Sequence, residues 1–434
     1  MRSRLVKLMV AVALVAMAIP SFAAVENVKV GGEIDVKMLY RDGFDFGAFD
    51  LDTTTFTYIG TKVYLSAELT DNVSAMIQLI NERDFGNDYL REIEGSLIVD
   101  QAYVKLADLM VPGLNLTVGR QEIQLGEGLV VGSRYRMIDY VGADIGTVAL
   151  DLGQQKAFDA LKIDYAFPAT DLTMTAFKAK ILETYGILDP LVGVDDLDLY
   201  GLAVKYDNGR LCVEPYFVYL RLANPDVDLM TLGARAGFSP MDSLKLKLEL
   251  AKQFGDQDLT GSDFNGWAAL LGGSYTFAGA SEPTLSLGLM YLTGQDLGEA
   301  DVEAWVPVFP SNVASRVGKI AYPTLFQAGD GLGALSLVNG TTGLQVINIG
   351  FGMKPAEKVA LDVDFYNLKA LETPTGVDKG LGNEIDLSMK YMYTEDVSFG
   401  VDLGILLAGD NIDDMLGGDS DNPWQLIGSM KVAF

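Results

Sequence analysis

The residues with the clearest capacity to bind a solute are three arginines that lie close together in the sequence. Arg120, Arg134 and Arg136 are accompanied by Gln121 and Tyr135. Guanidinium groups hold carboxylates and phosphates through paired hydrogen bonds. If the segment that carries them folds into an enclosed space, the three side chains form a cationic constriction that selects solutes by charge. If it stays at the surface, the same charges meet solvent or surface phosphates.

Acidic segments raise the question of a metal site. In the last of them, Asp410, Asp413 and Asp414 follow one another closely. Carboxylates at this density are hard oxygen ligands of the kind that calcium takes. Because the spacing of a complete calcium-binding loop is missing, solvated charge that prevents aggregation is the alternative interpretation. No cofactor and no other metal are expected.

The composition excludes several kinds of chemistry. There is no histidine, which removes Ser-His and Cys-His nucleophiles and every histidine-based metal site. The single cysteine, Cys212, has no partner within the chain for a disulfide. The formal net charge of −27 disfavours nucleic acid as a partner. The protein is therefore expected not to be an enzyme.

The amino-terminal segment has the pattern of an export signal. Basic residues precede a short apolar run, 8–19, and a small-x-Ala motif ends at Ala23. Cleavage after Ala23 removes a signal peptide, 1–23, and leaves one domain, 24–434. The alternative is an uncleaved anchor helix, for which the run is short. No later apolar run is long enough to span a bilayer as a helix.

The rest of the chain alternates between apolar and polar residues, which is the pattern of β-strands with one apolar face. Leu244, Leu246, Leu248 and Leu250, for example, alternate with two lysines and a glutamate. In the seventh segment, 172–181, the alternation is broken and the facing stays open. About eighteen such segments are predicted: 28–40, 58–69, 73–80, 98–106, 114–120, 157–167, 172–181, 199–206, 211–220, 230–238, 244–254, 267–277, 285–293, 344–353, 359–366, 384–393, 397–406 and 424–434.

Short turns and long loops follow one another alternately between these segments. The turns 70–72 and 207–209 are short, whereas 121–156 and 294–343 are long. This asymmetry is typical of transmembrane barrels, whose short turns face the periplasm. Since lipid offers no water to pair free backbone groups, a spanning sheet must close on itself. The sequence therefore predicts an all-β fold, a transmembrane antiparallel β-barrel of about 18 strands.

In such a barrel the charged face of each strand lines the lumen. Acids are about as frequent on this face as cations, and arginines are few, whereas a conduit for polyanions needs a row of arginines. A solvated wall with ion pairs between strands is the alternative to a solute-binding wall. The candidate pore residues are Arg120, Arg134, Arg136, Lys162, Lys205, Arg235, Lys245 and Lys247.

We also make predictions for one long loop and for the last strand. The loop 294–343 contains an apolar stretch, 305–310, that is unsuited to water, so we expect the loop to fold inward as a partial plug or to cover the mouth. The last strand, 424–434, ends on Phe434 and resembles the signal by which outer-membrane barrels are recognised during assembly. We expect it to pair with the first strand and to contact the barrel-assembly machinery through Phe434.

One stretch resembles a known family. The resemblance to the alginate-export family of porins rests on Val118-Gly119-Arg120-Gln121, on a Gly126-Glu127 turn, and on the strand that begins Ala157-Phe158-Asp159-Ala160. It implies a passive outer-membrane barrel with a charged lumen, in which anionic saccharides are one class of solute.

Three functions fit these expectations. The first is a porin, a passive diffusion channel for small polar or charged solutes in the outer membrane of a Gram-negative-type bacterium. The second is a dedicated channel for the export or uptake of a saccharide or organic anion of the alginate kind. The third is a structural or adhesion barrel with an occluded pore. In each, the surroundings are outer-membrane lipid and lipopolysaccharide.

Overall fold

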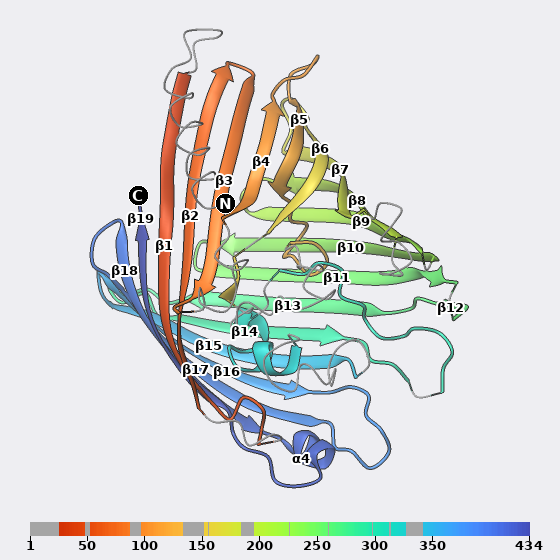
Figure 1. Cartoon of the computed structure of the whole chain (residues 1–434), viewed down its shortest axis with the longest axis vertical. Coiled ribbons are helices and arrows are strands. Elements are labelled where there is room, and N and C mark those ends of the chain that lie inside the picture. The colour runs from red at the N-terminus through yellow and green to blue at the C-terminus, as the bar shows by residue number, and fades with distance from the viewer. Residues whose placement is uncertain are drawn as a thin grey trace.

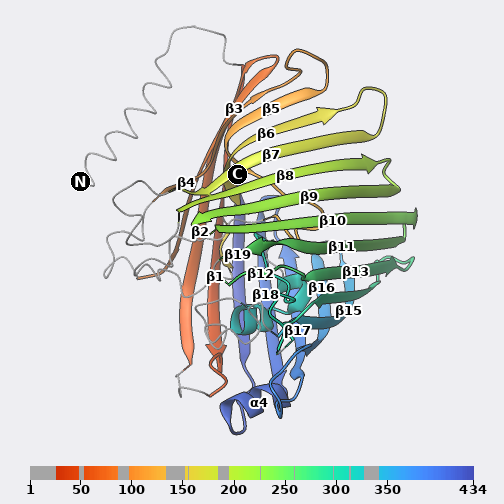
Figure 2. The same cartoon turned by 90° about the vertical axis from the view of Figure 1, so that its right-hand side faces the viewer.

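The computed structural model shows one antiparallel sheet that closes into a barrel (Figures 1 and 2). It describes residues 26–47, 53–86, 97–132, 152–154, 156–183, 195–224, 226–258, 260–296, 298–311, 314–326 and 342–434. The predicted signal peptide, 1–23, lies outside these residues. In the described part of the chain no helix is long and apolar enough to cross a membrane.

Each strand pairs with its neighbours in the sequence, and closure adds a pairing between β1 and β19. The strands are β1 (Glu26–Asp42), β2 (Thr54–Thr70), β3 (Val73–Asp84), β4 (Ile98–Leu106), β5 (Leu114–Glu122), β6 (Ala157–Ala166), β7 (Leu172–Leu182), β8 (Asp195–Asp207), β9 (Leu211–Asn224), β10 (Asp226–Met241), β11 (Leu244–Gln257), β12 (Ser262–Asp263), β13 (Trp267–Thr276), β14 (Thr284–Leu292), β15 (Leu344–Ala356), β16 (Val359–Lys369), β17 (Gly380–Met392), β18 (Val397–Ala408) and β19 (Trp424–Ala433).

The predicted number of strands in the wall is confirmed. The extra strand in the numbering, β12, has only two residues and pairs with the end of β11, at Asp256 and Gln257. It extends a hairpin beyond the wall, so 18 strands form the closed barrel. The predicted long loop 221–229 is also mostly strand, because β9 and β10 pair as far as Ala223 and Asp226.

The seam between β1 and β19 closes as expected. The pairing runs from Glu33↔Ala433 to Asp42↔Trp424. Beyond it, the Gly32 amide donates to the Phe434 carbonyl at 2.8 Å, and the Phe434 amide donates back at 3.0 Å. A Cβ on Gly32 would lie 2.6 Å from the Phe434 ring, so only glycine leaves room for that ring at the seam. Sheet closure removes the free edge that lipid cannot satisfy.

The predicted facing of the strands holds for most of the wall. Leu246, Leu248 and Leu250 of β11 are exposed on the outer face, where lipid covers them, whereas Glu249 between them is fully buried inside. Aromatic side chains pair near the strand ends, as Tyr40 does with Trp424 and Trp267 with Tyr291, which is the position of the interfacial girdles of such barrels.

In the seventh predicted segment, 172–181, the apolar side chains near the end face the lumen and the lysines face outward. On β7, Phe177, Ala179 and Ile181 point inward and are buried, because the inner wall here is covered by other parts of the chain. Lys178 and Lys180 lie on the outer face instead. They belong to a row of charged residues that crosses neighbouring strands in register: Arg120, Asp159, Lys180, Asp198, Arg221, Asp228 and Asp256.

Candidate functional site

Two loops enter the barrel and pair with each other. One follows β5 and includes residues 123–132; the other follows β14 and includes 298–311 and 314–326, with the short helices α3 (Ala314–Val317) and η4 (Tyr322–Phe326). Val131 and Phe309 form a parallel bridge. The Phe309 amide donates to Val130 O at 2.9 Å, and the Ser311 amide donates to Gly128 O at 2.8 Å. These bonds satisfy loop backbone groups that lie away from water.

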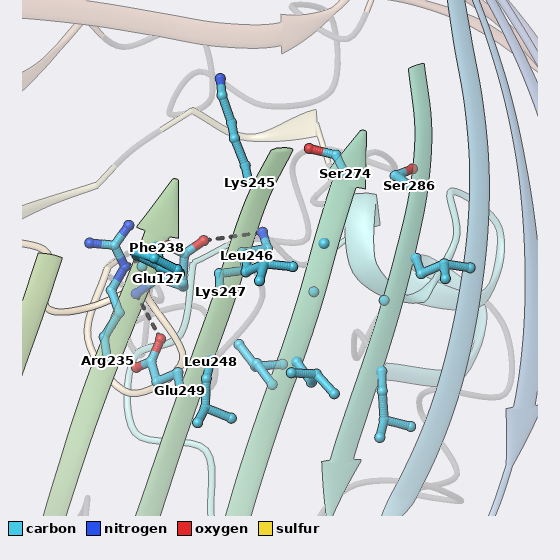
Figure 3. A pocket seen from close by; sticks show the side chains of 18 of the residues that line it. Glu127, Arg235, Phe238, Lys245, Leu246, Lys247, Leu248, Glu249, Ser274 and Ser286 are labelled. Atoms are coloured by element: carbon cyan, nitrogen blue, oxygen red, sulfur yellow. Dashed lines mark hydrogen bonds and ion pairs between the residues drawn. The ribbon is translucent and has the colours of Figure 1, made fainter. Parts of the chain in front are cut away.

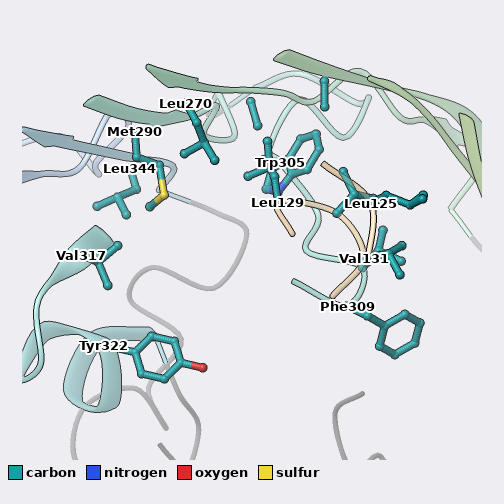
Figure 4. Close-up of a cluster of buried hydrophobic side chains, with 14 of the residues drawn as sticks. Leu125, Leu129, Val131, Leu270, Met290, Trp305, Phe309, Val317, Tyr322 and Leu344 are labelled. Carbon is teal, nitrogen blue, oxygen red and sulfur yellow. The ribbon is translucent and has the colours of Figure 1, made fainter. Parts of the chain in front are cut away.

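Apolar packing holds the second loop inside, as the sequence predicts. Trp305, Val308 and Phe309 are at most 7% exposed and belong to the same buried cluster as Leu270 and Met290 of the wall (Figure 4). Burial of each such side chain stabilises the docked loop by about 1.5–3 kcal/mol. The stretch 305–310 thus narrows the lumen rather than facing water.

Buried carboxylates of the wall hold the first loop. Glu214 of β9 accepts a hydrogen bond from the Gly126 amide at 3.2 Å, and Glu249 of β11 accepts one from the Glu127 amide at 2.7 Å. Tyr216 donates its hydroxyl to the other Glu249 oxygen at 2.6 Å. A Cβ on Gly126, whose φ is +56°, would lie 2.5 Å from Glu249 Oε1. The turn therefore needs glycine at this position to lie against the wall.

The second loop is held in the same way on β17. Glu384, which is fully buried, accepts the amides of Ile320 and Ala321 at 2.7 and 2.8 Å. Asp386 accepts the Lys319 amide at 3.1 Å. The Lys319 ammonium bonds to Asp402 and Ser388. Carboxylates that face inward at these points thus satisfy backbone donors of a loop that has left water.

Glu127 lies where the first loop meets three cations. Its Oε1 is 2.6 Å from Arg235 Nε, and its Oε2 is 3.2 Å from Lys247 Nζ and 3.9 Å from Arg316 Nη2. Figure 3 shows Glu127 between Arg235 and Lys247, with Lys245 extending away from them. Strands β10 and β11 position the first two cations, and α3 of the second loop brings Arg316.

The electrostatics of this cluster keep Glu127 ionised. Burial alone raises the pKa of the Glu127 carboxyl, but attraction to Lys247 and the hydrogen bond and charge of Arg235 outweigh it, so the pKa is lowered from 4.5. The Glu127 side chain is therefore negatively charged at neutral pH.

Two cavities meet at the Glu127–Arg235 pair, because both residues line each of them. The larger, of about 510 Å³, also contains Arg316 and Asp364, which come from different sides of the lumen. The smaller, of about 420 Å³, is lined mainly by polar side chains. The larger cavity is also lined by Leu246, Leu248 and Leu271 of the outer face, so it is not confined to the lumen. The ion pair lies in the lining that both cavities share, and this point is the candidate constriction.

Five of the predicted pore residues line these spaces. Lys162 and Lys205 border the smaller cavity, Lys245 and Lys247 border the larger, and Arg235 borders both. Their placement follows from the strand alternation, since each lies on the face opposite the lipid-exposed residues of its strand.

Arg120 is placed differently from the expectation. It shares the parity of Val118, which is 47% exposed on the outer face, and its nearest charged partner is Asp159 at 4.0 Å. Gln121, the next residue, points inward and donates to three backbone carbonyls instead. Arg120 is therefore not available to a constriction, and Arg134 and Arg136 lie outside the described residues.

The residues that sequence reasoning missed are those that the inward loops contribute. Glu127 and Arg316 come from loop segments whose contacts are with distant strands. The one local signal was the Gly126-Glu127-Gly128 turn, where a charged residue stands between two glycines with φ of +56° and +77°.

The acidic segment 410–421 contains the helix α4 (Asp410–Leu416), and its carboxylates bond to protein donors. Asp413 accepts the amide and hydroxyl of Ser420 at 2.7 and 2.6 Å, and Asp414 accepts the Asp378 amide at 2.7 Å. Among the described residues, no group of three or more histidine, cysteine or acidic side chains is arranged to hold a metal ion.

Comparison with known proteins identifies the family. A family model described as Gram-negative porin matches residues 10–307, which is more than half of the chain. The chain is a Gram-negative porin. It therefore forms an outer-membrane channel through which small solutes pass passively, surrounded by lipid and lipopolysaccharide. Porins are channel proteins and not a class of enzyme.

Solved structures show that this porin shares its fold with known channels. OpdO of Pseudomonas aeruginosa is similar with a TM-score of 0.60 and 12% identity, over 94% of this chain and 98% of that one. OccK11 (OpdR) of the same organism gives 0.58 and 11%, and OccAB1 of Acinetobacter baumannii gives 0.58 and 13%, each over 95% of this chain and 98% of the other. No curated protein matches the sequence.

These findings correct the resemblance to the alginate-export family. The matching family model and the similar structures are of other porins. The residues behind the resemblance, 118–121 and 157–160, lie at the ends of β5 and β6, where they pair in register. A strand that ends before a loop, followed by a strand that returns, is a feature of any such barrel, so this stretch does not separate one porin family from another.

Proposed function

We propose that this porin filters small polar solutes by charge at the Glu127 constriction and favours solutes that carry a carboxylate. The observation that carries the proposal is the contact of one carboxylate with Arg235, Lys247 and Arg316 in the lining shared by two cavities. Guanidinium and ammonium groups that are partly buried in protein attract anions more strongly than they do in open water.

Charged side chains around the lumen indicate where this filter acts. Cations on β6, β8, β10 and β11 border the two cavities, but Lys162 pairs with Asp164 at 3.4 Å and Lys205 with Asp207 at 3.0 Å. Asp362, Asp364 and Asp402 lie on the inward faces of β16 and β18, nearly half the ring of strands away from β8. Because these lysines are already paired, as Asp402 is with Lys319, the filter is expected to act at the cluster of Arg235, Lys247 and Arg316 around Glu127.

A dedicated organic-anion channel is the second candidate, and the same cation cluster favours it. A dedicated channel differs from a charge-filtering porin in that one solute binds tightly enough to saturate the channel. Arg134 and Arg136 remain candidates for a further contribution to the filter, and Ala23 for the end of a cleaved signal peptide. We also assign Phe434 to recognition by the barrel-assembly machinery.

Liposome swelling with solutes of matched size tests the proposal. Vesicles that contain the porin are diluted into isotonic sorbitol, sodium gluconate or N-methylglucamine chloride, which are neutral, anionic and cationic six-carbon polyols, and the swelling rates are compared. The proposal predicts swelling in all three, fastest for the organic anion. Equal rates for all charges would contradict the filter, and no swelling above empty vesicles would favour an occluded structural barrel.

A further inference from the structure

We infer that the Glu127 side chain is a tethered occupant of an anion-binding site made by Arg235, Lys247 and Arg316, and that a solute carboxylate passes by displacing it. This inference rests on the proposed function, since it concerns the same constriction. It assigns Glu127 a role in specificity, as a competitor that sets how strongly the site holds a passing anion.

The first argument is that the turn does not need the Glu127 side chain to stay in place. Its backbone is held by other groups: Glu214 accepts the Gly126 amide, Glu249 accepts the Glu127 amide, and Ser311 donates to Gly128 O at 2.8 Å. Arg316 Nη2 also donates to the Glu127 carbonyl. The carboxylate is therefore free to rotate away while the turn remains docked.

The second argument is that the cations have donors to spare. Within the part of the chain that the structure describes, Arg316 Nη1 is buried and has no hydrogen-bond partner. Arg316 Nη2 lies 3.9 Å from Glu127 Oε2, beyond hydrogen-bond distance. Lys247 Nζ, with three donor hydrogens, is 51% exposed as a side chain and contacts a single Glu127 oxygen at 3.2 Å. The site therefore holds more donors than Glu127 satisfies.

The third argument is the position of the site. Arg235 and Glu127 line both cavities, so a solute in either cavity lies next to this pair. Glu127 is 17% exposed, which leaves its carboxylate within reach of a solute in either space. Because a fixed cation cluster would hold an anion and slow its release, an internal competitor lowers that affinity and keeps the flux high.

The chemistry of the ligand follows from what already occupies the site. A carboxylate fits between Arg235 Nε and Lys247 Nζ, because Glu127 places one there. A small dicarboxylate such as succinate, or inorganic phosphate, presents the same paired oxygens. Comparison of the two probes shows whether planar carboxylate or tetrahedral oxyanion geometry is preferred.

The test is block of single-channel current by succinate and by phosphate in planar bilayers. Variants are Glu127→Gln, which keeps the shape and removes the charge, and Glu127→Asp, which keeps the charge and shortens its reach. Since an intramolecular competitor acts at an effective concentration in the millimolar range or above, its removal is expected to lower the half-blocking concentration of succinate by about tenfold. The Asp variant is expected to lie between Gln and the wild type.

Two controls make the result specific. Glu282→Gln removes a carboxylate that is paired at 2.6 Å with Lys354 in an exposed turn, and it is expected to leave block unchanged. Addition of Arg235→Gln to Glu127→Gln is expected to abolish the gain, because it removes a cation of the site.

The outcomes separate this inference from the proposed function. Wild-type and E127Q channels that conduct with the same half-blocking concentration would overturn the inference and leave the charge filter standing. Weaker block in E127Q would also overturn it, because Glu127 would then help to build the site. If wild-type channels show no preference among charged solutes in the swelling assay, the proposed function fails whatever the result of block.

Discussion

Replacement of Trp305 by alanine tests whether the second inward loop is held by its apolar contacts. Trp305 is 3% exposed and belongs to the buried cluster shared with Leu270 and Met290, and its amide donates to Thr293 O at 2.9 Å. That backbone bond survives the substitution, so the loss is one of packing. Truncation of a buried tryptophan costs about 3–5 kcal/mol.

This cost translates into a change in gating. Every 1.4 kcal/mol is about tenfold in an equilibrium constant, so the ratio of undocked to docked loop is expected to rise by about two to three and a half powers of ten. The barrel stays folded, because its strands pair without the loop. Single-channel recordings should show more frequent steps to a larger conductance, since an undocked loop leaves a wider lumen.

A matched control is available on the outer face. Trp267 is 41% exposed, stacks on Tyr291 and faces lipid. Trp267→Ala removes the same side chain without touching the loop, so its recordings should resemble the wild type. If W305A and W267A give the same conductance and the same frequency of steps, the loop is not held by Trp305 and the reasoning is refuted.

Three further predictions follow from charge and pairing. Because the pKa of Glu127 is lowered from 4.5, its charge is retained above that value and is lost only as the pH falls through the lower folded pKa. Reversal potentials should therefore differ between wild type and E127Q from pH 7 to pH 5 and converge only in stronger acid. Convergence already near pH 6 would contradict the assignment. Arg120→Gln should leave ion selectivity unchanged, since Arg120 faces outward beside Asp159, and a shift as large as that of Arg235→Gln would place it in the lumen. Deletion of Phe434 removes two hydrogen bonds to Gly32 and should reduce the yield of heat-resistant folded barrel on gels, while channels that do insert keep the wild-type conductance; equal yields would remove its role in assembly.

Much of the barrel was predictable because strand alternation is local. Two consecutive residues, such as Leu248 and Glu249, indicate by their types which face of the strand meets lipid and which meets the lumen, and distant parts of the chain are not needed for this. On β7 the alternation left the facing open, and the structure places Phe177 and Ala179 inward. The inner wall is apolar there because inward loops cover it. The residues of a strand do not by themselves predict which part of the wall a loop will cover.

The candidate site was predictable only as far as the wall extends. Lys162, Lys205, Arg235, Lys245 and Lys247 follow from parity. Arg120 was also within reach of that rule, since it shares the parity of Leu116 and Val118, but its position before a loop favoured a place in the constriction. The partners that complete the site are carried by loops. Their contacts depend on long-range docking, which residue spacing does not encode.

The central claim is that cations at the Glu127 constriction set the charge preference of this porin. The most direct measurement is the single-channel reversal potential across a potassium chloride gradient, for the wild type and for Arg235→Gln combined with Lys247→Gln. The account predicts open channels in both, with a shift toward cations in the double variant. Identical reversal potentials in the two proteins would contradict it.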